Sequence, residues 1–149
     1  GGAVCGAWWT GDICFDGTPN GYPVYAIRGS ELRWRYKSTG QLFEHQMRLY
    51  QRGSDPKRRD EIIANIWDAN SDWNVVWYED GERKGAMMKG RGMDPLSVKL
   101  HSGDQLPVKH KWVDPVNTDH LFYAKVSASA KEVFVEATDK WGRVYTRRA

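Results

Sequence analysis

The stretch "YPVYAIRGSELRWRYKSTG" (residues 22–40) consists of two runs of β-forming residues on either side of a Gly-Ser pair. A two-residue loop of this kind typically closes a β-hairpin. In the second run apolar and basic residues alternate, so Leu32, Trp34 and Tyr36 share one face and the arginines between them lie on the other. We therefore predict an antiparallel hairpin with one core face and one solvent face.

Short β-type runs of the same kind continue along the chain. They are "EIIANIWDAN" (61–70), "DWNVVWYEDGERKGAMMKG" (72–90), "DHLFYAKVS" (119–127) and "KEVFVEATDKWGRVYTRRA" (131–149). Turn-forming residues inside the second and the last run are typical of hairpin connections. This spacing indicates an all-β fold, an antiparallel β-sandwich. We expect residues 59–149 to be immunoglobulin-like or fibronectin-like, with additional strands from the N-terminal part.

Three other segments lie between these runs or beside them. "GQLFEHQMRLYQRG" (40–53) fits both helical and alternating spacing, and we predict a strand. Residues 53–60 are polar and basic, which favours a surface connection between two halves of the fold. Residues 91–118 are predicted to be a long loop, with one helical turn after Asp94-Pro95. We expect residues 1–149 to form a single domain.

The composition is that of a soluble globular domain, with 40% hydrophobic and 28% charged residues. Eight tryptophans make the chain aromatic-rich, which fits sheets with one buried face. The net charge of +3 comes from 22 basic and 19 acidic residues, a balance that does not indicate a nucleic-acid partner. No apolar run reaches the roughly 18 residues of a membrane helix, so we expect no membrane span. The chain begins without methionine, and we interpret it as a piece of a longer protein.

The two cysteines, Cys5 and Cys14, are either bridged or two buried thiols, and their spacing does not decide between these states. The four histidines are scattered along the chain, and no second cysteine pair accompanies them. This pattern disfavours a zinc site.

The usual catalytic motifs are missing. The phosphate-binding glycine loops, the GxSxG nucleophile elbow and the HExxH zinc motif do not occur. Residues 11–16, "GDICFD", resemble the metal-bridging GDxxD motif, but one residue too many separates Asp12 from Asp16. His120 follows Asp119 in a strand, where neighbouring side chains point to opposite faces. We therefore interpret His120 as a structural histidine satisfied by hydrogen bonds.

The N-terminal stretch contains the candidate docking or ligand surface. Residues 16–22 fit an oxygen-rich cation loop or a rigid double turn, and turn chemistry favours the second. If the preceding residues form a strand, the adjacent indoles of the Trp-Trp pair point to opposite faces. Our hypothesis is that the turn fixes an aromatic edge and that its acid and amide side chains cap it. The candidate residues are Trp8, Trp9, Asp16, Asn20 and Tyr22.

Several of these stretches together resemble the C-terminal domain that follows the catalytic core in a family of bacterial calcineurin-like phosphoesterases. The resemblance rests on "GAWWTGDICFDGTPNGYPVYAI", "LRWRYKSTG", "HQMRLY", "DWNVVWYEDG", "TDHLF" and "ATDKWGRVYT", which cover nearly the whole chain in the order of the family. It implies that the catalytic DxH, GDxxD, GNH and GHxH motifs, and two divalent metal ions, belong to a catalytic core outside this chain. No cofactor or catalytic residue is then expected here.

The resemblance implies a non-catalytic accessory domain that packs on or positions the phosphoesterase domain of the same polypeptide. The parent protein would be a metal-dependent hydrolase, exported to the periplasm or the cell exterior. An alternative is a carbohydrate-binding β-sandwich module of an exported protein, which requires a row of exposed aromatic side chains. A third hypothesis is an independent enzyme, which requires a deep pocket with perturbed titratable groups.

Overall fold

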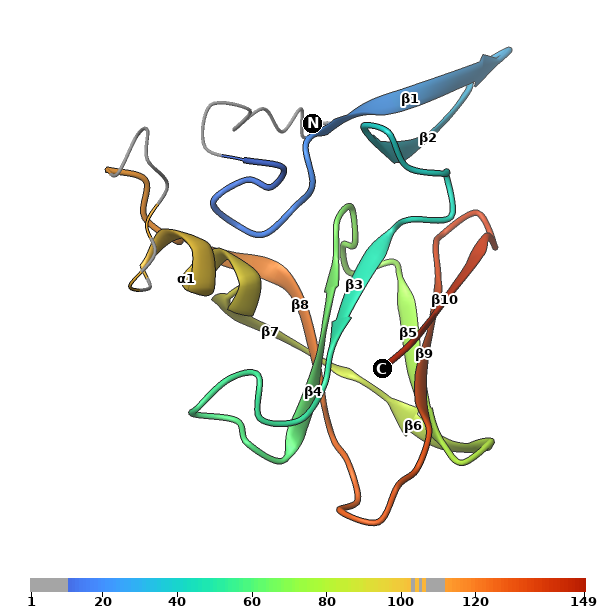
Figure 1. Ribbon diagram of the computed structural model, residues 1–149. Coiled ribbons are helices and arrows are strands. Elements are labelled where there is room, and N and C mark those ends of the chain that lie inside the picture. Colours follow the sequence, from blue (N-terminus) through green and yellow to red (C-terminus); the bar gives the residue numbers. More distant parts are fainter. Residues whose placement is uncertain (1–10, 103, 105, 107–111) are drawn as a thin grey trace.

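The computed structural model describes residues 11–102, 104, 106 and 112–149, and Figure 1 shows how their elements are arranged. The elements are β1 (Gly21–Arg28), β2 (Glu31–Ser38), β3 (Met47–Tyr50), β4 (Glu61–Ile66), β5 (Asn74–Glu79), β6 (Glu82–Ala86), β7 (Met88–Met93), α1 (Pro95–His101), β8 (Asn117–Lys125), β9 (Val133–Thr138) and β10 (Val144–Arg148). All pairings between these strands are antiparallel. The predicted all-β sandwich is confirmed. No helix in this part of the chain is long and apolar enough to cross a membrane.

Two four-stranded sheets form the sandwich, with strand orders β10-β9-β5-β6 and β3-β4-β8-β7. Alternate residues of β4, such as Ile62 and Ala64, point inward and meet Val135 and Ala137 of β9 in one buried cluster. Because the inner faces of both sheets contribute to this cluster, it is the main core of the molecule.

The β1–β2 hairpin is a separate two-stranded sheet that projects from the sandwich (Figure 1). Its register pairs Arg28 with Glu31 across the Gly-Ser loop, as predicted. The predicted core face is only partly correct. Tyr36, at the base, is buried, whereas Leu32, near the tip, is 47% exposed. Alternation places these side chains on one face, but the sandwich does not extend beneath the tip.

Two other predictions need correction. In residues 40–53 only Met47–Tyr50 is a strand, because the preceding residues turn so that the Gln46 side chain donates to the carbonyls of Tyr36 and Phe43. In residues 91–118, β7 continues to Met93 and the predicted helical turn is the full helix α1, with Asp94 as its N-cap. The segment at 53–60 lies between neighbouring strands of one sheet, β3 and β4.

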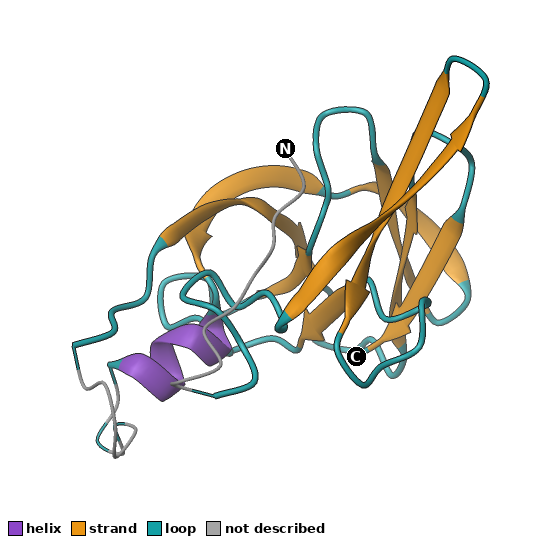
Figure 2. Ribbon diagram, turned by 90° about the horizontal axis from the view of Figure 1, so that it is seen from above, coloured by secondary structure: helices purple, strands orange, loops and turns teal. Residues whose placement is uncertain are grey.

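The 11–20 turn and α1 lie over the outer face of the β3-β4-β8-β7 sheet. Ser97 of α1 donates to the carbonyl of Phe15, and Asn65 of β4 donates to the carbonyl of Asp16. Beneath them Ile63, Leu121 and Tyr123 form a second buried cluster. Figure 2 shows the helix beside the strands, at one side of the molecule. This covered outer face positions the polar residues described next.

Candidate functional site

Of the five predicted docking residues, the structure describes Asp16, Asn20 and Tyr22. Trp8 and Trp9 lie outside the described residues. Asp16 and Asn20 belong to the 11–20 turn, where their side chains bind backbone: Asp16 Oδ1 accepts from the amide of Thr18 at 2.9 Å, and Asn20 Nδ2 donates to the carbonyl of Gly11 at 2.8 Å. The interpretation of this stretch as a turn is confirmed.

Tyr22 and Cys14 are two further N-terminal residues that the structure describes. Tyr22 is exposed and pairs with Lys37 on the basic face of the hairpin. Cys14 is disulfide-bonded, while Cys5 lies outside the described residues. The bridged alternative therefore holds for Cys14.

A buried polar network lies beneath the 11–20 turn. Its centre is the carboxylate of Asp94, which has no exposed surface. This carboxylate accepts hydrogen bonds from the Tyr50 hydroxyl at 2.6 Å, from Asn65 Nδ2 at 2.7 Å and from the backbone amide of Ser97 at 2.9 Å. Burial and the Asp94 charge raise the pKa of Tyr50, so its phenol stays protonated and donates.

The position of Gly17 in the turn depends on this carboxylate. Gly17 has a φ of +82°, and a Cβ atom there would lie 2.0 Å from Cγ of Asp94. The turn can therefore close over Asp94 only with glycine at this position. Arg48 completes the contact by donating to the Gly17 carbonyl at 2.8 Å.

His120 is part of the same network. Asn65 uses its amide nitrogen as a donor to Asp94, so its Oδ1 is the acceptor that faces His120 Nδ1 at 2.7 Å. The other ring nitrogen faces Asp16 Oδ2 at 3.3 Å. Burial alone would raise the pKa of Asp16, but bonds from His120 and Thr18 outweigh it and hold this pKa below its usual value. The structural interpretation of His120 is confirmed.

A β-bulge brings His120 to this face. The register between β7 and β8 shifts, so that Asp119 and His120 lie opposite Arg91 alone. Such a bulge re-aims a side chain relative to strict alternation. Sequence reasoning missed this network, although the polar Asn65 inside the apolar run "EIIANI" was a signal for it.

The hydrogen bonds of the network join the 11–20 turn, β4 and α1. Its polar groups bind one another, and within the described residues Asp12 is exposed and forms no hydrogen bond with Asp16. That part of the chain also contains no group of three or more His, Cys, Asp or Glu residues that could hold a metal ion. The residues that the structure describes therefore do not fit a phosphoesterase metal centre.

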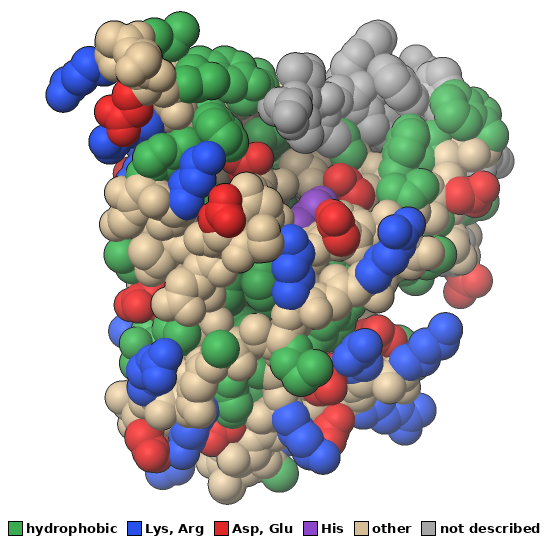
Figure 3. All heavy atoms as spheres, turned by 180° about the vertical axis from the view of Figure 1, so that it is seen from behind, with side chains coloured by type: hydrophobic (Ala, Val, Ile, Leu, Met, Phe, Trp, Pro, Cys, Tyr) green, Lys and Arg blue, Asp and Glu red, His purple; other side chains and the backbone are tan. Residues whose placement is uncertain are grey.

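The β1–β2 hairpin presents an apolar face that the described residues leave uncovered at its tip. Directly paired residues share a face, and the pairs are Tyr25 with Trp34 and Ile27 with Leu32. Exposure is 76% for Ile27 and 50% for Tyr25. Figure 3 shows hydrophobic side chains gathered on the projecting hairpin, at the upper left of that view. We call these four residues the hairpin patch.

The hairpin patch borders a hollow of about 560 Å³, and its inner end is fixed. The Trp34 ring packs edge-on against Trp141 at 4.6 Å, and Arg143 donates to the Trp34 carbonyl. Asp68 lines the same hollow, and burial raises the pKa of its carboxyl while a bond from Trp34 partly offsets this. The patch is therefore held firmly at its base.

The opposite face of the hairpin is basic. It carries Arg33, which pairs with Glu31 at 2.7 Å, and Arg35, whose guanidinium stacks on the Phe43 ring at 3.6 Å. The hairpin is therefore amphipathic, with a hydrated face and an apolar face.

Comparison with known proteins identifies the family. The family described as the C-terminal of calcineurin-like phosphoesterase matches residues 1–145. Searches of the curated proteins and of the solved structures found no significant match. Because the family match covers nearly the entire chain, the chain belongs to the family of C-terminal domains of calcineurin-like phosphoesterases.

Proposed function

We propose that this chain is a non-catalytic accessory domain that packs on and positions the phosphoesterase domain of the same polypeptide. Family membership supports the association with a phosphoesterase. Two-metal hydrolysis needs clustered ligands from several loops, and we assign those ligands, with their two divalent ions, to the catalytic domain. The comparisons do not support the carbohydrate-binding alternative.

The hairpin patch is the observation that carries this proposal. Contiguous apolar surface on a folded domain marks an interface when nothing within the domain covers it. Ile27 and Leu32 pair at the tip and are both largely exposed. The family match supports a phosphoesterase domain as the occupant, since these domains accompany a phosphoesterase.

The fixed base of the hairpin makes the patch suitable for docking. Trp34 is held by Trp141, and the Tyr36 hydroxyl donates to the Pro19 carbonyl at 2.5 Å. A surface held in its bound conformation loses less conformational entropy when its partner binds. We therefore place the contact with the catalytic domain on the hairpin patch.

Hydrogen exchange in the full-length parent tests this contact. Amides at the tip of β1 and β2 should exchange more slowly in the parent than in the isolated chain. The double variant Ile27→Thr/Leu32→Thr, which places a β-branched residue at each position, should remove that protection. The matched control is Ala26→Thr/Arg33→Thr on the basic face, which should retain it. Equal exchange in the parent and the isolated chain would contradict the contact.

Activity assays test the non-catalytic assignment. Phosphatase and phosphodiesterase turnover should be measured for this chain and for the full-length parent, with and without manganese or zinc. We expect turnover from the parent alone. Metal-dependent turnover by the chain would disprove the assignment.

We also propose that the parent protein is exported. The disulfide at Cys14 supports this, because disulfides persist in oxidising compartments and are rare in the cytosol. Alkylation of the parent, isolated without reductant, should leave Cys14 unlabelled. Complete labelling at Cys14 would contradict export.

A further inference from the structure

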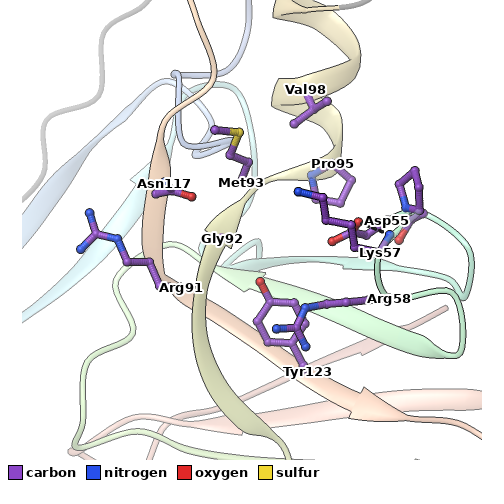
Figure 4. A pocket seen from close by; sticks show the side chains of 12 residues that line it. Asp55, Lys57, Arg58, Arg91, Gly92, Met93, Pro95, Val98, Asn117 and Tyr123 are labelled. Atoms are coloured by element: carbon purple, nitrogen blue, oxygen red, sulfur yellow. Dashed lines mark hydrogen bonds between the residues drawn. The ribbon is translucent and has the colours of Figure 1, made fainter.

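A second hollow lies between the turn at 54–58, β7 and the start of α1. Its volume is about 600 Å³. Figure 4 shows side chains from these three elements and from β8 around it. Met93, Pro95 and Val98 supply apolar wall, whereas Lys57, Arg58 and Arg91 supply positive charge. This combination fits a ligand with an anionic group and an apolar part.

Tyr123 contributes a hydroxyl donor to the wall of this pocket. The residue is only 6% exposed, and its hydroxyl makes no hydrogen bond to any described residue. In Figure 4 the hydroxyl points into the hollow, beside Gly92. Burial raises the pKa of Tyr123, and the Arg58 guanidinium offsets this only in part, so the phenol remains protonated near neutral pH. The hydroxyl is therefore available to donate a hydrogen bond to an acceptor in the hollow.

The glycines of β7 make room for this tyrosine. A Cβ atom at Gly92 would lie 2.5 Å from the Tyr123 hydroxyl, and one at Gly90 would lie 2.8 Å from its ring. Only residues without side chains allow the phenol to lie against β7 with its hydroxyl at the pocket wall.

The basic side chains around the Tyr123 hydroxyl differ in their ion pairing. The Arg58 guanidinium stacks over the Tyr123 ring at 4.0 Å and pairs with Glu61 at 2.8 Å, so its position is fixed. Lys57 and Arg91 form no ion pair within the described residues. Figure 4 shows the Lys57 ammonium pointing into the hollow, whereas the Arg91 guanidinium starts at its edge and points away from Tyr123. Asp55 is the one acidic residue in the lining, so positive charge exceeds negative charge.

We propose that this pocket binds the phosphate group of a small phosphate ester. The Tyr123 hydroxyl and the Lys57 ammonium donate to the phosphate oxygens, Arg91 adds positive charge, and the ester group packs against Met93 and Val98. A phosphate offers several acceptor oxygens and up to two negative charges, which suits this set of donors. The site is separate from the hairpin patch and does not depend on docking.

Titrations followed by backbone amide NMR test the proposal with two probes, inorganic phosphate and phenyl phosphate, at constant ionic strength. Phenyl phosphate should shift the amide signals of Lys57, Gly92 and Tyr123 and reach saturation. Tyr123→Phe should weaken binding about tenfold or more, because a hydrogen bond to a charged group is lost. Its control, Tyr22→Phe, removes an exposed hydroxyl and should bind like the original chain.

A second pair of variants tests binding at exposed positions, where a substitution should not disturb the fold. Lys57→Gln should weaken binding, whereas the matched Lys131→Gln, which removes an exposed lysine elsewhere, should not. Equal affinity for the two probes would assign the site to free phosphate and overturn the ester. Shifts that do not saturate, or that are unchanged in Tyr123→Phe, would overturn the binding site altogether.

Discussion

The network around Asp94 and the tip of the β1–β2 hairpin differ in both polarity and burial. Asp94 is a charged side chain with no exposed surface, and three donors from the chain bind it. Ile27 is an apolar side chain that is 76% exposed. The described residues satisfy the buried charge but leave the apolar tip exposed, where such surface is unfavourable in water. The comparison teaches that the fold is complete around Asp94, whereas the tip is suited to a contact outside this domain.

The largest expected effect is from Asp94→Ala. This change leaves the Tyr50 hydroxyl, the Asn65 amide and the Ser97 amide without their acceptor in a buried site. We expect a loss of about 3 to 5 kcal/mol in the free energy of unfolding, measured with urea. The control is Asp114→Ala at an exposed acid, which should change stability little. A loss as small as that of the control would show that the network does not hold the fold.

Gly17→Ala should have the next largest effect. The new methyl group would overlap Asp94, and alanine is strained at this positive φ. We expect a loss of about 2 to 4 kcal/mol, again in urea unfolding. Gly53→Ala is the matched control, because Gly53 has a φ of +80° with nothing within 4 Å of its Cβ position. If both variants lose the same stability, the turn does not depend on its contact with Asp94.

The protonation of His101 should make the stability of the same region depend on pH, with a smaller effect than the two substitutions above. Burial lowers the pKa of His101 below 6.5, and its ring faces the Ser97 hydroxyl at 3.1 Å. Since the folded state disfavours the charged ring, the stability contribution is complete above pH 6.5 and is lost as pH falls through the folded pKa. An NMR titration of the His101 ring should give a midpoint below 6.5. A midpoint above it would contradict the buried environment.

The smallest expected effect concerns the tip itself. In the isolated chain, Ile27→Thr/Leu32→Thr should change the unfolding free energy by no more than about 0.5 kcal/mol per site, since these side chains are largely exposed. Thermal and urea unfolding would measure this. A loss of several kcal/mol would mean that the tip supports this domain, and the contrast with Asp94 would then fail.

Local signals in the sequence predicted the local structure correctly. The loop at Gly29-Ser30 and the turn at Asp80-Gly81 close hairpins as predicted, because the backbone needs of two-residue turns are readable from a few neighbouring residues. The helix after Asp94 was also signalled by its N-cap and the following proline. Turns and helix caps can therefore be predicted, because they depend on the residues at the turn or cap itself.

The candidate sites depend on contacts between distant segments, which the sequence could not supply. His120 meets Asp16 across 104 positions of the chain, and only the bulge in β8 makes that contact. Alternation in β2 separated two faces correctly, but it could not show that the sheets of the described residues do not extend under Leu32. The phenol of Tyr123 was likewise predicted only as part of an apolar strand.

The bulged strand pair has a consequence for how the protein behaves in concentrated solution. β7 is an edge strand, so its outer row of backbone groups is a potential template for a strand of another molecule. The register shift interrupts the regular pairing surface there, and Lys89 and Arg91 add charge along it. These features disfavour edge-to-edge polymerisation, so self-association through this sheet should be weak even at high protein concentration.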